Sequence, residues 1–409
     1  MNVILIATLD TKGLEAQYVR DRLNSLGINV QLIDAGVMGQ PVVTPDVPRA
    51  ELFAAAGINL PQLIERADRG EAVSQAAQAV AQHVQREFAA GRVAGVIGLG
   101  GSAGTSIATA AMRQLPVGIP KVMVSTVASG DVRGFVGPRD IFMLYSVVDI
   151  AGLNRVTRQI LANAADAMAG MVLNRASQAA LITQVDRPLI AATMFGVTTP
   201  CIEQAKQVFE SAGYEVLVFH ATGSGGMAME GLIRDGVFAG VFDITTTELA
   251  DLHVGGVMSA GESRLTAAAE CGVPQVVSLG ATDMVNFWAY DTVPSVFRER
   301  NLYRHNQNVT LMRTTSAECR EIADDLAGKL LTARGPYHVF LPAAGVSAID
   351  RQGQPFDDPA ARQTMMSRIQ NQLPATHVTE LPNHINDAAF AEAAAAKLIA
   401  LIEGDDHHD

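Results

Sequence analysis

Cysteine is scarce in this sequence, and the three that occur stand far apart. Cys201, Cys271 and Cys319 form neither a CxxC pair nor a zinc-site spacing, which argues against a disulfide framework and favours a reducing compartment. No apolar run approaches the ~20 residues that span a bilayer. The opening segment MNVILIATLDTKG lacks the basic region of a signal peptide. We therefore expect a soluble, cytoplasmic protein with no membrane partner.

Positive charge is also in short supply. The chain has 30 Lys and Arg against 42 Asp and Glu, a net charge of −12. A surface of this sign repels phosphate backbones and argues against general nucleic-acid binding. Hydrophobic residues make up 48% and charged residues 18% of the chain, a globular composition. At roughly 100–200 residues per domain, 409 residues predict two or three domains.

A long internal repeat sets the predicted fold. Residues 3–36 and 189–223 each read as an apolar strand, a Thr/Gly loop, an amphipathic helix, a glycine turn and a second apolar strand. Apolar runs such as VILIA and VLVF are typical of parallel strands buried on both faces. We predict an α/β protein with two doubly wound, Rossmann-like parallel-sheet domains, related by this weak repeat. The predicted domains are 1–185, which binds nucleotide, and 186–409, which holds a substrate site.

The strand-to-helix loops are the places where such folds bind ligands. The TLDTKG loop (residues 8–13) offers Lys12 beside Asp10 and Thr11, and its alternative interpretation is a plain helix cap. The GLGGSAGT loop (residues 98–105) lets the backbone approach a ligand at a helix N-terminus, which predicts an anion site. It formally satisfies GxGxxG/A, but the following strand KVMVST does not end in the acid that binds a ribose in NAD sites. The alternative is a tight packing turn.

Two further segments carry small polar residues at strand ends. Ser125 and Thr126 follow the strand KVMV, and their small hydroxyls suggest polar ligand contacts. Asp149 follows a predicted strand and precedes a predicted helix, so it is either an acid near the helix N-cap or a ligand contact. The TGSGG loop (residues 222–226) is a second, weaker candidate anion site.

The second half gathers acids at strand ends, where they can line one cleft. A carboxylate pair near a histidine is what acid–base catalysis needs, and His253 lies nearby in the sequence. For each acid the alternative is a helix cap, and TTTE at 245–248 resembles a capping box. The candidate catalytic residues are Asp243, Glu248, Glu262, Arg264 and Asp283.

Motifs along essentially the whole chain resemble the family of the tomato mosaic virus resistance protein. They are TLDTKG, GLGGSAGT, YSVVDIAGLN, HATGSGGMAMEGLI, DITTTELAD, SAGESRL, LGATDMVNF and LPAAGVSAID. The first domain of that family is described as ATP-binding, so the resemblance implies an ATP site, with Mg²⁺ inferred to accompany the nucleotide. The antiviral role of the plant member is not carried over. Combined with the loops, the expected cofactor-binding residues are Asp10, Thr11, Lys12, Gly13, Gly100, Gly101, Ser102, Gly104, Thr105, Ser125, Thr126 and Asp149.

Three functions remain open at this point. The favoured one is an ATP-binding enzyme of small-molecule metabolism that acts on an acidic metabolite. The second is a nucleotide-responsive binding module without catalysis, and the third is a lyase or isomerase that needs no nucleotide. We also expect a homo-oligomer, because α/β metabolic proteins often use symmetric interfaces.

Overall fold

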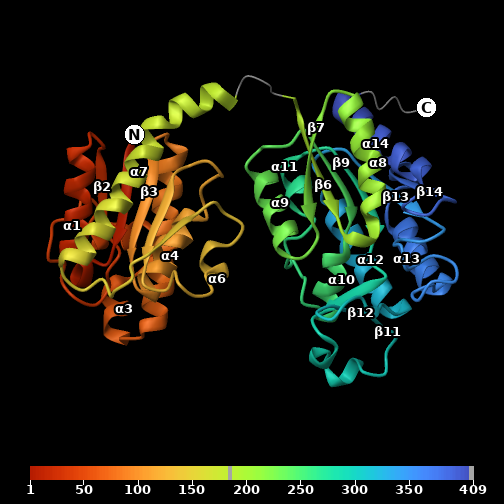
Figure 1. Ribbon diagram of the computed structural model, residues 1–409, viewed down its shortest axis with the longest axis horizontal. Helices are drawn as coiled ribbons and strands as arrows, with labels where there is room; N and C mark the ends of the chain where they lie inside the picture. Colours follow the sequence, from red (N-terminus) through yellow and green to blue (C-terminus); the bar gives the residue numbers. More distant parts are fainter. Residues whose placement is uncertain (183–186, 405–409) are drawn as a thin grey trace. The chain divides into compact units, whose positions relative to one another are not determined.

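The computed structural model describes residues 1–182 and 187–404, and the chain forms two compact units (Figure 1). The first comprises residues 1–185 and the second residues 186–409. The predicted boundary, between residues 185 and 186, lies outside the described residues. No helix in the described part of the chain has the length and apolarity needed to cross a membrane.

The first domain is built on a parallel sheet of five strands in the order β2-β1-β3-β4-β5. The apolar runs of the sequence form these strands, because parallel strands covered on both faces bury nearly every side chain. Their bounds are β1 (Asn2–Ala7), β2 (Val30–Asp34), β3 (Val93–Gly100), β4 (Lys121–Ser125) and β5 (Phe142–Tyr145).

Helices cover both faces of the first sheet. One layer consists of α1 (Leu9–Ser25) and α7 (Arg155–Ile182), which pack Val19 and Ala165 against the strands. The opposite layer buries Phe53, Val80 and Ile107. It is formed by α2 (Arg49–Ala55), α3 (Leu60–Arg66), α4 (Arg69–Ala89) and α5 (Ser102–Met112), with the short α6 (Arg133–Val136) beside α5.

The second domain is built on a six-stranded parallel sheet in the order β14-β13-β9-β8-β6-β7. Its strands are β6 (Leu189–Met194), β7 (Glu215–His220), β8 (Gly240–Thr245), β9 (Gln275–Gly280), β13 (Tyr337–Pro342) and β14 (Val378–Leu381). A small antiparallel sheet, in the order β10-β12-β11, is inserted between β9 and β13. It comprises β10 (Met284–Phe287), β11 (Leu302–Arg304) and β12 (Thr310–Arg313).

The second sheet is likewise covered on both faces. On one face, α8 (Thr199–Ser211) and α14 (Ala388–Glu403) bury Ile202 and Phe390. On the other lie α9 (Ser224–Arg234), α10 (Thr247–Val254), α11 (Ala267–Cys271), α12 (Ser316–Leu331) and α13 (Pro359–Gln372).

The two sheets share one strand order. Read from β2, the first sheet runs second, first, third, fourth strand; read from β7, the second sheet does the same. The predicted α/β, doubly wound, Rossmann-like fold is therefore confirmed. In each sheet the second strand lies on one side of the first strand, and the third and later strands lie on the other side. This reversal creates a topological switch point between the first and third strands. Ligands of doubly wound folds bind at this point, beyond the carboxyl ends of the strands.

Candidate functional site

The switch point of the first domain lies between β1 and β3, and the two predicted ligand loops flank it. The TLDTKG loop follows β1, and the GLGGSAGT loop includes the end of β3 and the start of α5. The two loops are predicted from their residue types, without knowledge of the strand order. The pairing of β1 with β3 therefore supports them independently.

The GLGGSAGT loop presents vacant backbone donors. Gly101 precedes α5 and offers no side-chain cap. The backbone N–H groups of Ser102, Ala103 and Gly104 find no acceptor among the described residues. A Cβ atom at Gly100 would lie 2.9 Å from the Cα atom of Gly104, so the tight turn requires glycine there. Vacant N–H groups at the positive end of a helix attract an anion.

Two of the predicted ligand residues instead hold this loop in shape. Thr105 and Ser125 are buried, and their hydroxyl oxygens lie 2.7 Å apart. The Thr105 hydroxyl also donates to the Gly101 carbonyl at 2.8 Å. Thr126 is half-buried beside Gly101, which leaves its hydroxyl available to a ligand, whereas Asp149 is exposed. The structure thus gives Thr105 and Ser125 a supporting role within the loop.

The TLDTKG loop does not form the predicted cap. The Thr8 side chain does not cap the backbone of α1, and its hydroxyl oxygen lies 2.9 Å from that of Thr11. Asp10 accepts a hydrogen bond from the Gly39 N–H at 3.0 Å. Thr11 is exposed, and Gly13 is packed closely against Val42. The helix is interrupted at Lys12 (φ −127°, ψ 17°), a half-buried residue that forms no ion pair with the described chain.

Sequence reasoning missed one acid at this site. Asp34 ends β2, beside β1, and its Oδ1 atom accepts hydrogen bonds from the N–H groups of Leu9 (3.2 Å) and Gly36 (3.0 Å). Burial raises the pKa of its carboxyl group. Its signal in the sequence is that VQLID ends in an acid, as a ribose-binding strand does, whereas KVMVST does not.

Two carboxylate oxygens here are buried without a hydrogen bond from the described residues, Asp10 Oδ1 and Asp34 Oδ2. The nearest cation recorded at Asp34 is Arg49, with its Nε atom 3.8 Å from Oδ2. Oxygens of this kind are suited to a hard cation such as Mg²⁺, which protein sites commonly bind through one or two carboxylates plus substrate phosphates. Asp10 and Asp34 therefore fit the ion that was inferred with ATP.

The TGSGG loop of the second domain is an anion site that the protein fills itself. Glu248 Oε1 accepts hydrogen bonds from the N–H groups of Gly223 (2.7 Å) and Gly226 (3.1 Å). Glu248 therefore does not form the predicted capping box with Thr245, which instead lies 2.8 Å from the Thr198 hydroxyl. The backbone N–H groups of the TGSGG loop therefore bind a carboxylate of the protein, whereas no carboxylate of the described chain is bound by those of the GLGGSAGT loop.

Gly226→Ala tests how tightly this internal anion is held. A Cβ atom at residue 226 would lie 2.1 Å from Glu248 Oε2, and Glu248 is fixed on both sides. We expect a loss of about 1–3 kcal/mol in the free energy of unfolding, as for other overpacked sites. Gly328→Ala is the matched control, because Gly328 is also helical but faces open space. Equal thermal midpoints for the two variants would contradict the expectation.

The predicted catalytic residues do not line one cleft, which corrects the expectation from sequence. Asp243, Glu248 and Glu230 surround Arg264 in what we call the Arg264 cluster. Arg264 Nη2 lies 2.6 Å from Asp243 Oδ1, and its Nε atom lies 2.6 Å from Glu248 Oε2. The arginine is 0% exposed. Glu262 is exposed, and it forms no ion pair with the described part of the chain.

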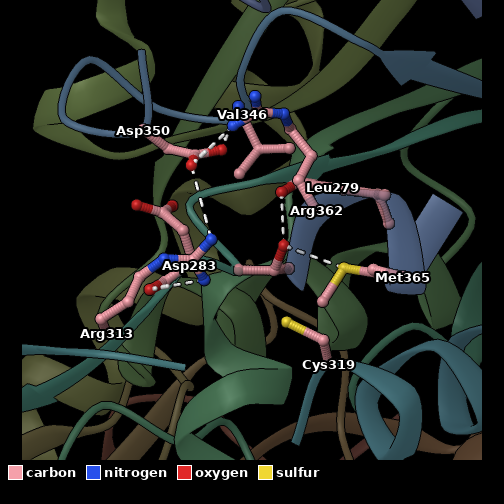
Figure 2. A pocket seen from close by; sticks show the side chains of 9 residues that line it. Leu279, Asp283, Arg313, Cys319, Val346, Asp350, Arg362 and Met365 are labelled. Atoms are coloured by element: carbon pink, nitrogen blue, oxygen red, sulfur yellow. Dashed lines mark hydrogen bonds and ion pairs between the residues drawn. The ribbon is translucent and has the colours of Figure 1, made fainter. Parts of the chain in front are cut away.

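Asp283 belongs to a second buried group, the Asp283 cluster, with Ser347, Arg313, Asp350 and Arg362. Figure 2 shows Asp283, Arg313, Asp350 and Arg362 around a cavity of about 10 Å³, enough for one water molecule. Ser347 Oγ donates to Asp283 Oδ2 at 2.8 Å, and Arg362 Nη1 donates to Asp350 Oδ1 at 2.8 Å. Burial, reinforced by the Asp350 charge, raises the pKa of Asp283 to about 7. Both clusters are closed to a substrate of metabolite size.

Comparisons with known proteins cover nearly the whole chain. Models of the N-terminal and C-terminal domains of the uncharacterised protein family UPF0261 match residues 1–177 and 187–402. A UPF0261 protein of Clostridium tetani is 48% identical over 405 residues, which is 98% of this chain and 99% of that protein. A UPF0261 protein of Rhizobium meliloti is 45% identical over 397 residues, 96% and 97% of the two chains. The ToMV resistance protein Tm-1(GCR237) of Solanum lycopersicum is 42% identical over 411 residues, 96% of this chain and 54% of that protein.

Proposed function

The chain belongs to the uncharacterised protein family UPF0261, and we propose that its first domain binds ATP at the switch point between β1 and β3. The observation that carries this proposal is the row of vacant N–H groups at Ser102, Ala103 and Gly104. The TGSGG loop offers a comparison within the same chain. Its backbone N–H groups donate to the Glu248 carboxylate, whereas those of the GLGGSAGT loop have no acceptor among the described residues.

The residues around the loop suit a nucleotide. Backbone donors of α5 would hold a phosphate group, and Lys12 of the neighbouring loop would add a positive charge. When bound, Mg²⁺ would neutralise phosphate charge, and Asp10 and Asp34 would hold it. The choice of adenosine over another nucleoside rests on the family resemblance to the plant resistance protein.

Gly101→Val is expected to remove ATP binding while leaving the fold intact. Gly101 is extended (φ −80°, ψ −159°), and the nearest atom to a Cβ there would be Thr126 Oγ1 at 3.6 Å, an ordinary contact. The valine methyl groups would cover the vacant donors. Losing one charge-assisted hydrogen bond costs about 2 kcal/mol, so we expect an affinity loss of at least about 30-fold. Calorimetric titration of Mg-ATP into the full chain measures it.

The control is Gly196→Val in the second domain, in the loop after β6, where a Cβ atom meets nothing within 4 Å. NAD is titrated in parallel, because Asp34 supplies the strand-end acid that an NAD site uses. Absence of saturable ATP binding by the wild type, or equal binding by Gly101→Val, would refute the proposal.

A second candidate is a nucleotide-responsive binding module without catalysis. It is favoured by the burial of Asp243, Glu248, Arg264 and Asp283, four of the five residues predicted to act on an acidic metabolite. An enzyme of that kind would need other residues for its chemistry. Release of phosphate from ATP in the presence of carboxylic acids, measured against Gly101→Val, distinguishes the two: turnover identifies the enzyme, and binding without turnover identifies the module.

A further inference from the structure

A groove runs along the surface of the first domain between α1 and α7. Its volume is about 510 Å³, within the usual range of small-molecule sites. Tyr18 of α1 forms one wall, Arg155 and Arg158 of α7 form the other, and Leu153 and Ala162 add apolar surface.

The groove is fixed at two points along the helices. Near the start of both, the Gly152 N–H donates to Glu15 Oε1 at 2.5 Å, which ties the residues before α7 to α1. Farther along, Arg22 binds Asp166 through two hydrogen bonds of 2.7 and 3.0 Å. The residues between these contacts are therefore held on two rigid elements, as precise recognition requires.

Two arginines in the groove have no counter-charge. Arg155 and Arg158 are exposed, and neither forms an ion pair with a carboxylate of the described chain. Both lie among the first four residues of a 28-residue helix, where the helix dipole disfavours a cation. Unlike a single exposed arginine, these two line the same groove, so their unpaired positive charges can both reach one anion there. Arg22, farther along on α1, differs from these two arginines because it forms an ion pair with Asp166.

One of these arginines is already oriented over an aromatic ring. The Arg158 guanidinium carbon lies 5.4 Å from the centre of the Tyr18 ring, a cation–π contact. The guanidinium is therefore preorganised to bind phosphate oxygens in a bidentate manner. The ring edge and the surfaces of Leu153 and Ala162 remain for an apolar or planar part of the same ligand.

We propose that this groove is a second anion site, which binds an organic phosphate monoester. Arg155 and Arg158 contact the phosphate, and the organic part lies against Tyr18 and Leu153. The site uses none of the residues of the GLGGSAGT loop, so it is independent of ATP binding there. It would make the first domain responsive to a second metabolite.

The test is calorimetric titration of AMP and of inorganic phosphate into the full-length wild type and three variants. Arg155→Gln/Arg158→Gln removes both charges and should weaken AMP binding at least 10-fold. Arg69→Gln is the matched control, because Arg69 is an exposed arginine in the first turn of α4, and it should leave binding unchanged. Gly101→Val should keep one AMP site, since it blocks only the GLGGSAGT loop.

Three results would overturn the proposal. AMP binding that disappears in Gly101→Val places the ligand at the GLGGSAGT loop. Equal affinities of the double variant and Arg69→Gln exclude the arginines. Inorganic phosphate that binds as tightly as AMP excludes a contribution from the organic part. Unchanged circular dichroism of each variant confirms that binding, and not folding, was altered.

Discussion

Replacing Arg264 by Met will lower the free energy of unfolding of the second domain by about 3–5 kcal/mol. The guanidinium is the shared partner of Asp243, Glu248 and Glu230, and it is 0% exposed. Methionine keeps the apolar stem of the side chain but lacks the guanidinium group, which leaves three buried carboxylates without their shared cation. Burial already raises the pKa of Glu248 with the arginine in place, so the variant will favour protonation there and will recover part of its stability at low pH.

Urea unfolding at pH 7.5 measures this effect in the intact chain. Trp288 is the single tryptophan of the sequence and lies in the second domain, so its fluorescence reports on that domain alone. Arg234→Met is the control, because the Arg234–Glu270 pair is solvent-exposed and such pairs contribute about 0–1 kcal/mol. A loss of under about 1 kcal/mol for Arg264→Met would mean that the cluster is not the electrostatic centre of the domain.

The fold was predictable because its signals are local. Continuous apolar runs such as VILIA mark strands buried on both faces, and glycines mark where the chain leaves them. The strong helix formers of residues 71–91 belong to α4 (Arg69–Ala89), and the alanine-rich segment 387–402 belongs to α14 (Ala388–Glu403). Each of these features depends on neighbouring residues, so periodicity is enough to find it.

The partners of the polar residues were not predictable in the same way. Local spacing suggested that Glu248 caps its own helix, yet its carboxylate is bound by N–H groups 22 and 25 residues earlier. Asp283 contacts the Ser347 hydroxyl, 64 residues away. A side chain at a strand end can face solvent, a ligand or another strand end. Which of these it faces depends on the order of the strands in the sheet, and local sequence does not contain that order. Clusters of acids in a sequence therefore indicate an edge of the sheet more reliably than a catalytic cleft.

Asp283→Asn is expected to flatten the pH dependence of stability in the second domain. Burial raises the pKa of Asp283 to about 7 in the folded state, against roughly 4 in an unfolded chain. The folded protein then binds the extra proton between these values, so the wild type loses stability as the pH rises from about 4 to about 7, and no further above that. The wild type should therefore lose stability relative to the variant over this pH range, by at most about 1.4 kcal/mol per pH unit. Burial also raises the pKa of Asp350, so the variant keeps part of the slope.

Unfolding by urea at intervals between pH 4 and pH 8, followed again by Trp288 fluorescence, gives the two curves. Asparagine can still accept the Ser347 hydrogen bond through its side-chain oxygen, so the packing at 283 is preserved. Asp324→Asn serves as the control: a hydrogen bond from Arg368 lowers the pKa of this exposed aspartate, so its curve should run parallel to that of the wild type above pH 4. If the stability curve of Asp283→Asn is also parallel to that of the wild type, Asp283 is ionised over the whole pH range. The positive charges of Arg313 and Arg362 would then neutralise the negative charges of Asp283 and Asp350.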